Sequence, residues 1–259
     1  MSNEIMSELR KDFIYNLMIK GEREDGRKFD EYREIKIETN VIEKAEGSAR
    51  VRLGDTHLVV GVKIQTGTPF PDTPDKGVIM TNLELLPLAS PTFESGPPRE
   101  DAVELARVVD RGIRESESID LSKLCIIPGE KVWMVFIDVH VLDDGGNIMD
   151  AASLGAIAAL MTAKLPAKRY DVGEDSPVPM RDVPVAVTAV EIGGTIMLDP
   201  SLNEQRIAGT KLTVISNQDG GISGMQKSGV NPLTTEQINY IVDAAIEKAK
   251  ELRQKFLEI

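Results

Sequence analysis

The sequence predicts an α+β fold with mixed or antiparallel sheets, in which a group of strands followed by a helix occurs twice. Strand-like segments come in consecutive groups instead of alternating singly with helices. A loop rich in proline and glycine, residues 165–184, separates the two groups. The chain contains neither a GxGxxG nor a Walker A motif, which argues against a doubly wound nucleotide-binding fold and against a kinase.

Residues 132–163 form the predicted centre of the first half. An apolar, β-branched run at 132–142 predicts a buried strand. The following DDGGN predicts a turn, because glycine tolerates positive φ and Asp and Asn bond their own backbone. Asp150 is the predicted N-cap of an apolar helix that continues to about residue 163. Its alanines and glycine allow close packing, and it is too short for a membrane span.

The other elements follow from periodicity and turn residues. An amphipathic helix is expected at 2–20, with an apolar stripe that packs on its own domain or on a neighbouring subunit. The stripe consists of Ile5, Leu9, Phe13 and Leu17, with Met6 and Ile14 beside it. Further strands are expected at 34–42, 48–53, 56–65, 78–88, 185–192, 195–198 and 211–217. Residues 218–229 read as a hairpin loop with short strand ends. Helices are expected at 100–117 and at 234–259, the latter opened by a Thr234–Gln237 capping box.

Composition restricts the function. The net charge is −12, whereas an isolated nucleic-acid binder is usually basic, so an RNA role requires a local basic patch or a basic partner. The charged N-terminus shows no signal peptide, and the single cysteine, Cys125, cannot form an internal disulfide, so we expect a cytoplasmic protein. Cys125, His57 and His140 are expected to be structural, with no metal site.

The clearest basic feature is a stripe of arginines on the predicted helix 100–117. Spacings of four and three residues place them on one face. They are Arg107, Arg111 and Arg114, with Arg99 just upstream. The stripe is either a solvated face with ion pairs to residues such as Glu104 and Glu115, or a surface for a phosphate backbone.

Five segments together resemble the RNase PH family of phosphorolytic exoribonucleases. They are EDGRKFDEYR, GSARVRLGDTHLVVGVKI, ELARVVDRGIRES, the strand into DDGGNIMDAASLGAIAAL, and GGTIMLDPSLNEQRI. The resemblance extends from about residue 21 to the C-terminal helix, which implies an N-terminal helix (1–20) and an RNase PH-like domain (21–259) with halves at about 21–165 and 184–259. The implied fold is the two-layer, ribosomal protein S5 domain 2-like type. The pattern is most similar to the non-catalytic RNase PH-like subunits of archaeal exosomes, and the first half of polynucleotide phosphorylase is also similar.

Two departures from the family pattern concern the chemistry. Active members carry a Thr-Arg-Thr type phosphate cradle after the central strand, whereas residues 145–149 here read GGNIM, without arginine. Active members also carry two aspartates after the LD motif, and these positions fall on Gln205 and Lys211. Phosphorolysis needs donors for the phosphate and carboxylates for a metal ion or proton transfer. The resemblance therefore implies a chain without catalytic residues, metal or other cofactor.

The resemblance also implies partners. The chain would pair with a catalytic RNase PH-like subunit, and three such pairs would close a hexameric ring with RNA-binding cap subunits. By the same resemblance, Arg107 and Arg111 would contact the backbone of single-stranded RNA, with Arg99 and Arg114 as weaker candidates. Two alternatives stay open. One is an active phosphate-dependent exoribonuclease that uses Asp182, Asp199 and Glu204, and the other is a small-molecule enzyme on a related fold.

Overall fold

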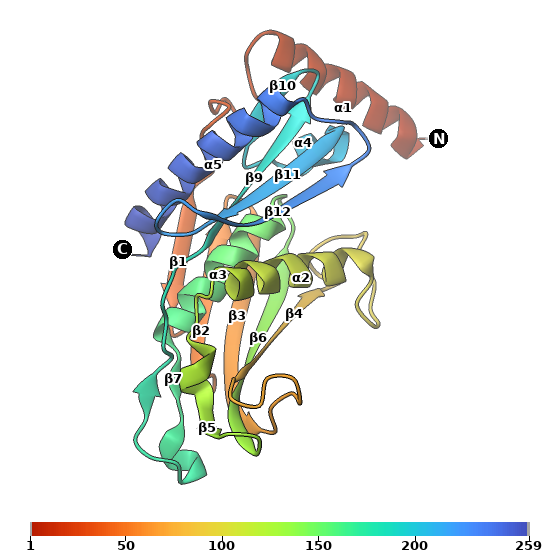
Figure 1. The fold of residues 1–259 in the computed structure, drawn as a ribbon. Helices are drawn as coiled ribbons and strands as arrows, with labels where there is room; N and C mark the ends of the chain where they lie inside the picture. The colour runs from red at the N-terminus through yellow and green to blue at the C-terminus, as the bar shows by residue number, and fades with distance from the viewer. Residues whose placement is uncertain (1, 258–259) are drawn as a thin grey trace.

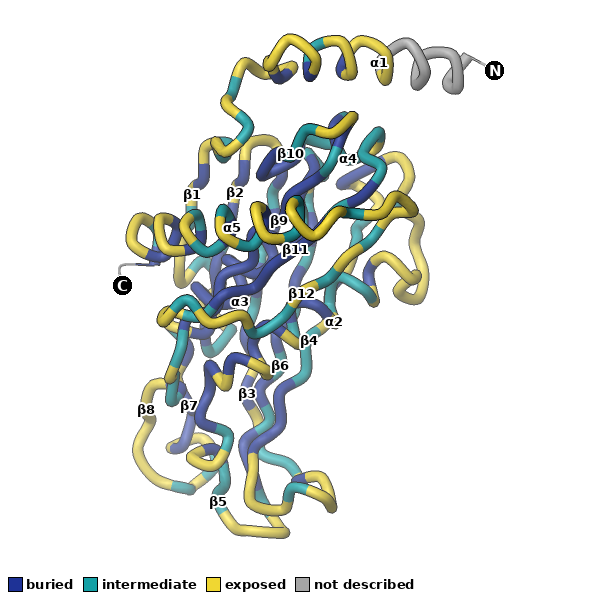
Figure 2. Tube along the Cα trace, turned by 45° about the horizontal axis from the view of Figure 1, so that its top comes forward, coloured by how far each residue is buried: buried dark blue, intermediate teal, exposed yellow. Residues whose placement is uncertain are grey.

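Two sheets lie one above the other, with helix α3 (Ile148–Thr162) between them in the computed structural model (Figure 1). The structure describes the backbone of residues 2–257 and the side chains of residues 11–257. Alanines of α3 and apolar residues of both sheets belong to one hydrophobic core. In Figure 2 this helix is almost entirely buried, as expected for a helix that is apolar on all sides.

The first sheet is mixed, with the order β1-β2-β3-β6-β4. Its strands are β1 (Ile35–Thr39), β2 (Gly47–Leu53), β3 (Thr56–Gly67), β4 (Val78–Leu85) and β6 (Lys131–Asp143). Neighbours are antiparallel except β4, which runs parallel to β6. The short strand β5 (Cys125–Ile127) also pairs with β6.

The second sheet is antiparallel throughout, with the order β10-β9-β11-β12. Its strands are β9 (Val185–Ile192), β10 (Thr195–Leu198), β11 (Thr210–Ser216) and β12 (Ile222–Gly229). The predicted α+β class with mixed and antiparallel sheets is therefore confirmed. The hairpin-loop prediction for 218–229 is wrong in its extent, because β12 pairs with β11 over its whole length.

Helices from both halves of the chain pack on the two sheets. They are α1 (Ser2–Ile19), α2 (Glu100–Glu115), α4 (Leu202–Ile207) and α5 (Thr235–Phe256), with 3₁₀ turns η1 (Leu121–Leu124) and η2 (Ala167–Tyr170). The Thr234 capping box of α5 is present: Gln237 N donates to Thr234 Oγ1 and Thr234 N donates to Gln237 Oε1. The long loop after α3 contains the two-residue strands β7 (Lys164–Leu165) and β8 (Ser176–Pro177).

The start of α3 differs from the prediction. Asn147, in the left-handed conformation at φ 55°, is the N-cap, and Asp150 lies in the first helical turn with its side chain fully buried. Asp150 accepts hydrogen bonds from Thr188 of β9, so it joins the two halves instead of capping the helix. Gly155 further along α3 lets the helix approach the first sheet, because a Cβ there would lie 2.8 Å from Val60 Cγ2.

Helix α1 packs on the second sheet through part of the expected apolar side. Ile14 and Met18 are buried in a small cluster with apolar residues of β9 and β10, whereas Phe13 is 53% exposed. Ile5 and Leu9 lie outside the described side chains. Leu17 of the predicted stripe also packs against this cluster, so Phe13 is the predicted residue that turns to solvent, and Met18 takes a place that the prediction did not include. Within residues 2–257, none of the helices combines the length and apolarity that crossing a membrane requires.

Candidate functional site

Four candidate arginines lie on α2 or just before it, and within residues 11–257 two of them form ion pairs whereas the other two do not. Arg107 and Arg111 are exposed, lie one helical turn apart, and form no hydrogen bond or ion pair with any side chain or backbone of the described residues. Arg114 instead donates from Nε to Asp110 Oδ2 at 3.0 Å and to the backbone of Ile79. Arg99 is exposed and ion-paired with Glu94. Arg107 and Arg111 therefore do not form the ion pairs with Glu104 or Glu115 that a solvated, charge-paired face would have.

A shallow groove runs beside this face. It has a volume of about 500 Å³ and lies between α2 and β4, with Arg107 and Arg111 along one wall and Thr81 and Asn82 on the other. Uncompensated guanidinium groups beside hydroxyl and amide side chains suit a phosphodiester backbone, because such contacts supply affinity without reading the base sequence. The groove thus places two free cations beside space for a polyanion, although Asp110 and Glu115 also line it.

A second cavity, of about 200 Å³, lies at the N-terminus of α3. It brings together the turn after β6 and the residues that follow the LD motif, two segments that the sequence placed more than fifty residues apart. Ile148 and Met149 of the turn line it, together with Gln205 of α4 and Lys211 of β11. The two segments that depart from the family pattern therefore meet at one cavity.

The chemistry of this α3 cavity does not suit a phosphate ion. Helix N-termini bind anions through free backbone N–H groups. Here the Asn147 N–H already donates to Gln205 Oε1 at 3.0 Å, and the next two side chains are apolar. Asp101, Glu104 and Asp144 line the same cavity and oppose an anion, against the single cation of Lys211. No arginine lines it.

The carboxylates of the alternative constellation are engaged elsewhere. Glu204 is buried and accepts a bidentate pair from Arg23, with Nη2–Oε2 at 2.6 Å. Asp199 is buried and bonded by Arg27 and Arg33. Burial works against its charge, but the hydrogen bonds and charge of Arg33 outweigh burial, so the pKa of Asp199 is lowered. These carboxylates tie the segment after α1 to the second half.

Asp182 does not join them. Its Oδ1 accepts from the backbone N–H groups of Val183 and Gln218, before the start of β9, whereas the backbone N–H of Asp199 bonds to Thr188 within that strand. No group of three or more His, Cys, Asp or Glu side chains among the described residues could hold a metal ion. The three carboxylates are therefore not assembled into one site.

A buried polar network connects the halves beneath the cavity. Asp150 accepts from Tyr32 Oη at 2.6 Å, from Asn147 Nδ2 at 2.7 Å, and from the backbone and hydroxyl of Thr188. Burial raises the pKa of Asp150 to about 6, although these hydrogen bonds partly oppose the rise. Sequence reasoning missed this network, because its only signal was a lone aspartate before an apolar helix.

The other candidate residues carry no site. His140 Nδ1 lies 3.4 Å from Glu84 on the first sheet, and Cys125 is half-buried in β5. Burial, followed by the charges of Arg52 and Arg50, lowers the pKa of His57. The two histidines lie on neighbouring strands of the first sheet, His57 on β3 and His140 on β6. The short helix α4 was also missed, although its S-x-x-E capping box was visible in the sequence.

Comparisons with known proteins give a consistent family. The model of the 3′ exoribonuclease family, domain 1, matches residues 31–166, and that of domain 2 matches residues 182–248. An exosome complex component Rrp42 from Methanocella arvoryzae is 68% identical over 255 residues, which is 98% of each chain. A protein of the same name from Archaeoglobus fulgidus is 54% identical over the full length of both chains.

Solved structures agree in fold. A chain of the Archaeoglobus fulgidus exosome with RNA bound to the active site superimposes with a TM-score of 0.95 at 55% identity, covering 97% of this chain and 99% of that one. A chain of an archaeal exosome core gives 0.92 at 50% identity, covering 99% and 100%. Rice Rrp46, at 19% identity and a TM-score of 0.70, shares the fold.

Proposed function

Because the chain belongs to the RNase PH family of 3′ exoribonucleases, we propose that it is a non-catalytic subunit of an archaeal-type exosome that guides RNA to a catalytic partner. Its relatives over nearly the whole chain carry the name of an exosome component, and two are seen in exosome structures. The family relationship supports RNA degradation as the process. The role within the complex is argued from this chain's own residues.

The observation that carries the non-catalytic role is the cavity at the N-terminus of α3. In active family members this place is expected to hold phosphate and carboxylates. Here Gln205 accepts from the backbone N–H of Asn147, the N-cap of α3, and Lys211 lines the same cavity. A phosphate ion would meet apolar side chains and a net negative wall, so the cavity opposes binding of the anion that phosphorolysis needs.

The RNA-guiding role is supported by Arg107 and Arg111. Both guanidinium groups are exposed and unpaired with the described residues, in a protein whose net charge is −12. Leaving two cations free on one helix face of an acidic chain concentrates attraction for a polyanion at that face. Arg99 and Arg114 are weaker candidates because each already pairs with a carboxylate.

The assembly belongs to the same proposal. We expect one catalytic RNase PH-like subunit per copy of this chain, three such pairs in a hexameric ring, and RNA-binding cap subunits on that ring. A cytoplasmic location and the absence of a cofactor in this chain are part of the same expectation. These expectations assign no catalytic role to any residue of the chain.

The decisive experiment measures phosphate-dependent shortening of a single-stranded RNA. The purified chain is assayed alone, and then mixed with a catalytic RNase PH-like partner. We expect no nucleoside diphosphate release by the chain alone and release by the mixture. Release by the chain alone would establish the alternative, an active phosphate-dependent exoribonuclease, and the assignment of its site would have to be replaced.

The arginine face is tested in the assembled complex. Arg107→Glu combined with Arg111→Glu should weaken RNA binding roughly tenfold or more at low salt and lower the salt dependence of binding by on the order of one to two released counterions. A matched control reverses two exposed lysines on α5, Lys250 and Lys255. Size-exclusion chromatography should show intact assembly for both variants. Equal RNA affinity of the two variants at low salt would contradict the proposal.

A further inference from the structure

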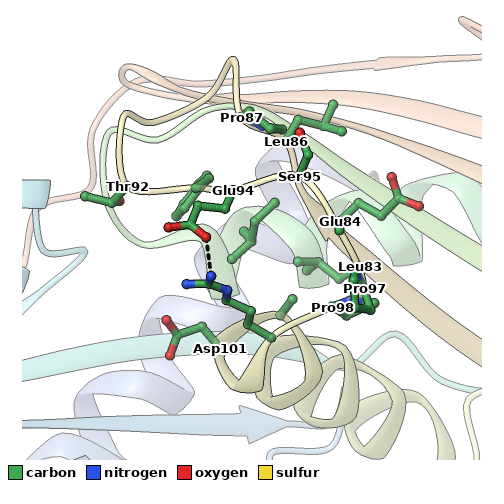
Figure 3. A pocket seen from close by; sticks show the side chains of 15 residues that line it. Leu83, Glu84, Leu86, Pro87, Thr92, Glu94, Ser95, Pro97, Pro98 and Asp101 are labelled. Atoms are coloured by element: carbon green, nitrogen blue, oxygen red, sulfur yellow. Dashed lines mark hydrogen bonds and ion pairs between the residues drawn. The ribbon is translucent and has the colours of Figure 1, made fainter.

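Two adjoining cavities form one continuous cleft beside the N-terminus of α2. The cavity in Figure 3, of about 340 Å³, lies under the loop 86–99, and the 200 Å³ cavity at α3 continues it. Both are lined by Leu85, Phe93 and Asp101. We call this feature the acidic cleft, because the carboxylates on its walls outnumber the cations.

Hydrogen-bond acceptors without donors line the α3 end of the acidic cleft. Asp101 has no hydrogen-bond or ion-pair partner among the described residues, and Glu104 accepts only from Gln226 Nε2, at 3.3 Å. Asn147 Oδ1 is buried and receives no donor within the described chain, although its Nδ2 donates to two aspartates. Asp101 is exposed and Glu104 is half-buried, so a ligand in the cleft can reach both carboxylates, whereas Asn147 Oδ1 is closed off from solvent. This end of the cleft therefore favours a ligand that donates several hydrogen bonds.

The two cations that line the cleft form no ion pair with Asp101 or Glu104. Arg99 is neutralised by Glu94 at the outer end, as the dashed line in Figure 3 shows. Lys211 is the cation that lines the inner end, and it forms no ion pair within the part of the chain that the structure describes. Three carboxylates, including Asp144, thus face one lysine. The remaining charge is negative.

The shape restricts the ligand further. At about 200 Å³ the inner cavity is smaller than the roughly 300–1,000 Å³ of typical small-molecule sites, so it suits one side chain better than a nucleotide. Its walls include Phe93, Leu105 and Met149, which would pack against an aliphatic stem. A guanidinium group offers five donors and always carries its charge, whereas an ammonium group offers three.

We propose that the acidic cleft receives an arginine side chain from a protein partner. The stem packs on the apolar wall, and the guanidinium donates to the carboxylates of Asp101 and Glu104. We assign the arginine to a protein because the loop 86–99, which borders the cleft, also carries an exposed apolar side chain. Leu88 on this loop is 72% exposed and offers a partner protein an apolar contact. Nucleic acid is disfavoured by the carboxylates. The inference adds a docking contact to the proposed function, and it does not depend on RNA binding or on the absence of catalysis.

The test uses the full chain and the peptide Ac-Gly-Arg-Gly-NH₂ as probe. Labelled methionine methyl groups are followed by NMR, because Met149 lines the inner cavity and no other methionine among residues 11–257 lines either cavity of the cleft. We expect a saturable shift of the Met149 methyl signal. The lysine analogue of the peptide should bind several-fold more weakly, because it offers fewer donors.

Two variants are expected to change the affinity for the arginine peptide in opposite directions. Asp101→Asn with Glu104→Gln should weaken binding roughly tenfold or more, because two charge-assisted hydrogen bonds are lost. Lys211→Ala should strengthen it, because the competing cation is removed. The matched control, Glu236→Gln with Glu247→Gln, changes an acidic residue in the first turn of α5 and one exposed residue further along. It should bind the peptide as the unmodified chain does.

Several results would overturn the inference. Equal loss in the test and control variants would mean that the probe responds to overall charge alone. Equal binding of the arginine and lysine peptides would remove the guanidinium assignment. A Met149 shift on titration with inorganic phosphate would show that the cleft takes an anion. The RNA-shortening assay is independent, so failure of this inference is distinguishable from failure of the proposed function.

Discussion

Asp150→Asn should remove a pH dependence of stability while keeping the buried network. In the unmodified chain one carboxylate oxygen accepts from Tyr32, Asn147 and the Thr188 backbone, and the other accepts from the Thr188 hydroxyl. An asparagine keeps its oxygen at the first position and places its amide at the second. Thr188 Oγ1 can then accept and donate onward to Thr213, because either hydroxyl of that pair can be the donor. All partners stay satisfied.

The magnitude follows from the pKa. Burial raises the pKa of Asp150 from 3.8 to about 6. The folded state therefore binds the proton more tightly than the unfolded state, and stability falls as the pH rises through this window. The full effect is about 3 kcal/mol. About 1.4 kcal/mol of it lies between about pH 5 and about pH 8. Asp150→Asn removes this contribution, so the variant should gain most over the unmodified chain at the higher pH.

Urea unfolding followed by the fluorescence of the single tryptophan, Trp133, measures the difference. The free energy of unfolding of variant and unmodified chain is compared at both pH values, which cancels the titration of all other groups. Asp243→Asn on the exposed side of α5 is the control for a general loss of charge, and its difference should not change with pH. A pH-independent difference for Asp150→Asn as well would refute the assignment of a buried, charged carboxylate.

Three further substitutions test the packing that positions the site. Arg23→Met leaves the buried Glu204 carboxylate unpaired and should cost about 3–5 kcal/mol by urea unfolding, with much of the loss recovered when Glu204→Leu is added. Thr234→Ala removes the N-cap of α5 and should cost about 1 kcal/mol in the same assay. Gly155→Ala places a methyl group against Val60 and should cost about 1–3 kcal/mol, and an unchanged midpoint would show that the helix can shift freely.

Local chemistry determines many of the secondary-structure elements of this chain independently of tertiary contacts. Both β9 and β10 begin and end where alternation and turn residues predicted, and the Thr234 box fixes the start of α5. The central strand, its glycine turn and the apolar helix are likewise encoded within one segment. The arginine spacing on α2 follows from helical periodicity. These features depend on residues a few positions apart, so periodicity and capping rules suffice.

Tertiary structure decided the features that depend on residues far apart in the chain. Asp150 is buried instead of capping its helix because Thr188 and Tyr32 approach it from other segments. Arg114 is engaged by its own helix and by β4, while Arg107 stays free. The inner end of the acidic cleft exists only because α4 and β11 of the second half meet α2 and α3 of the first. Charge pairing and cavities are set by which side chains meet across the core, and no local pattern encodes that.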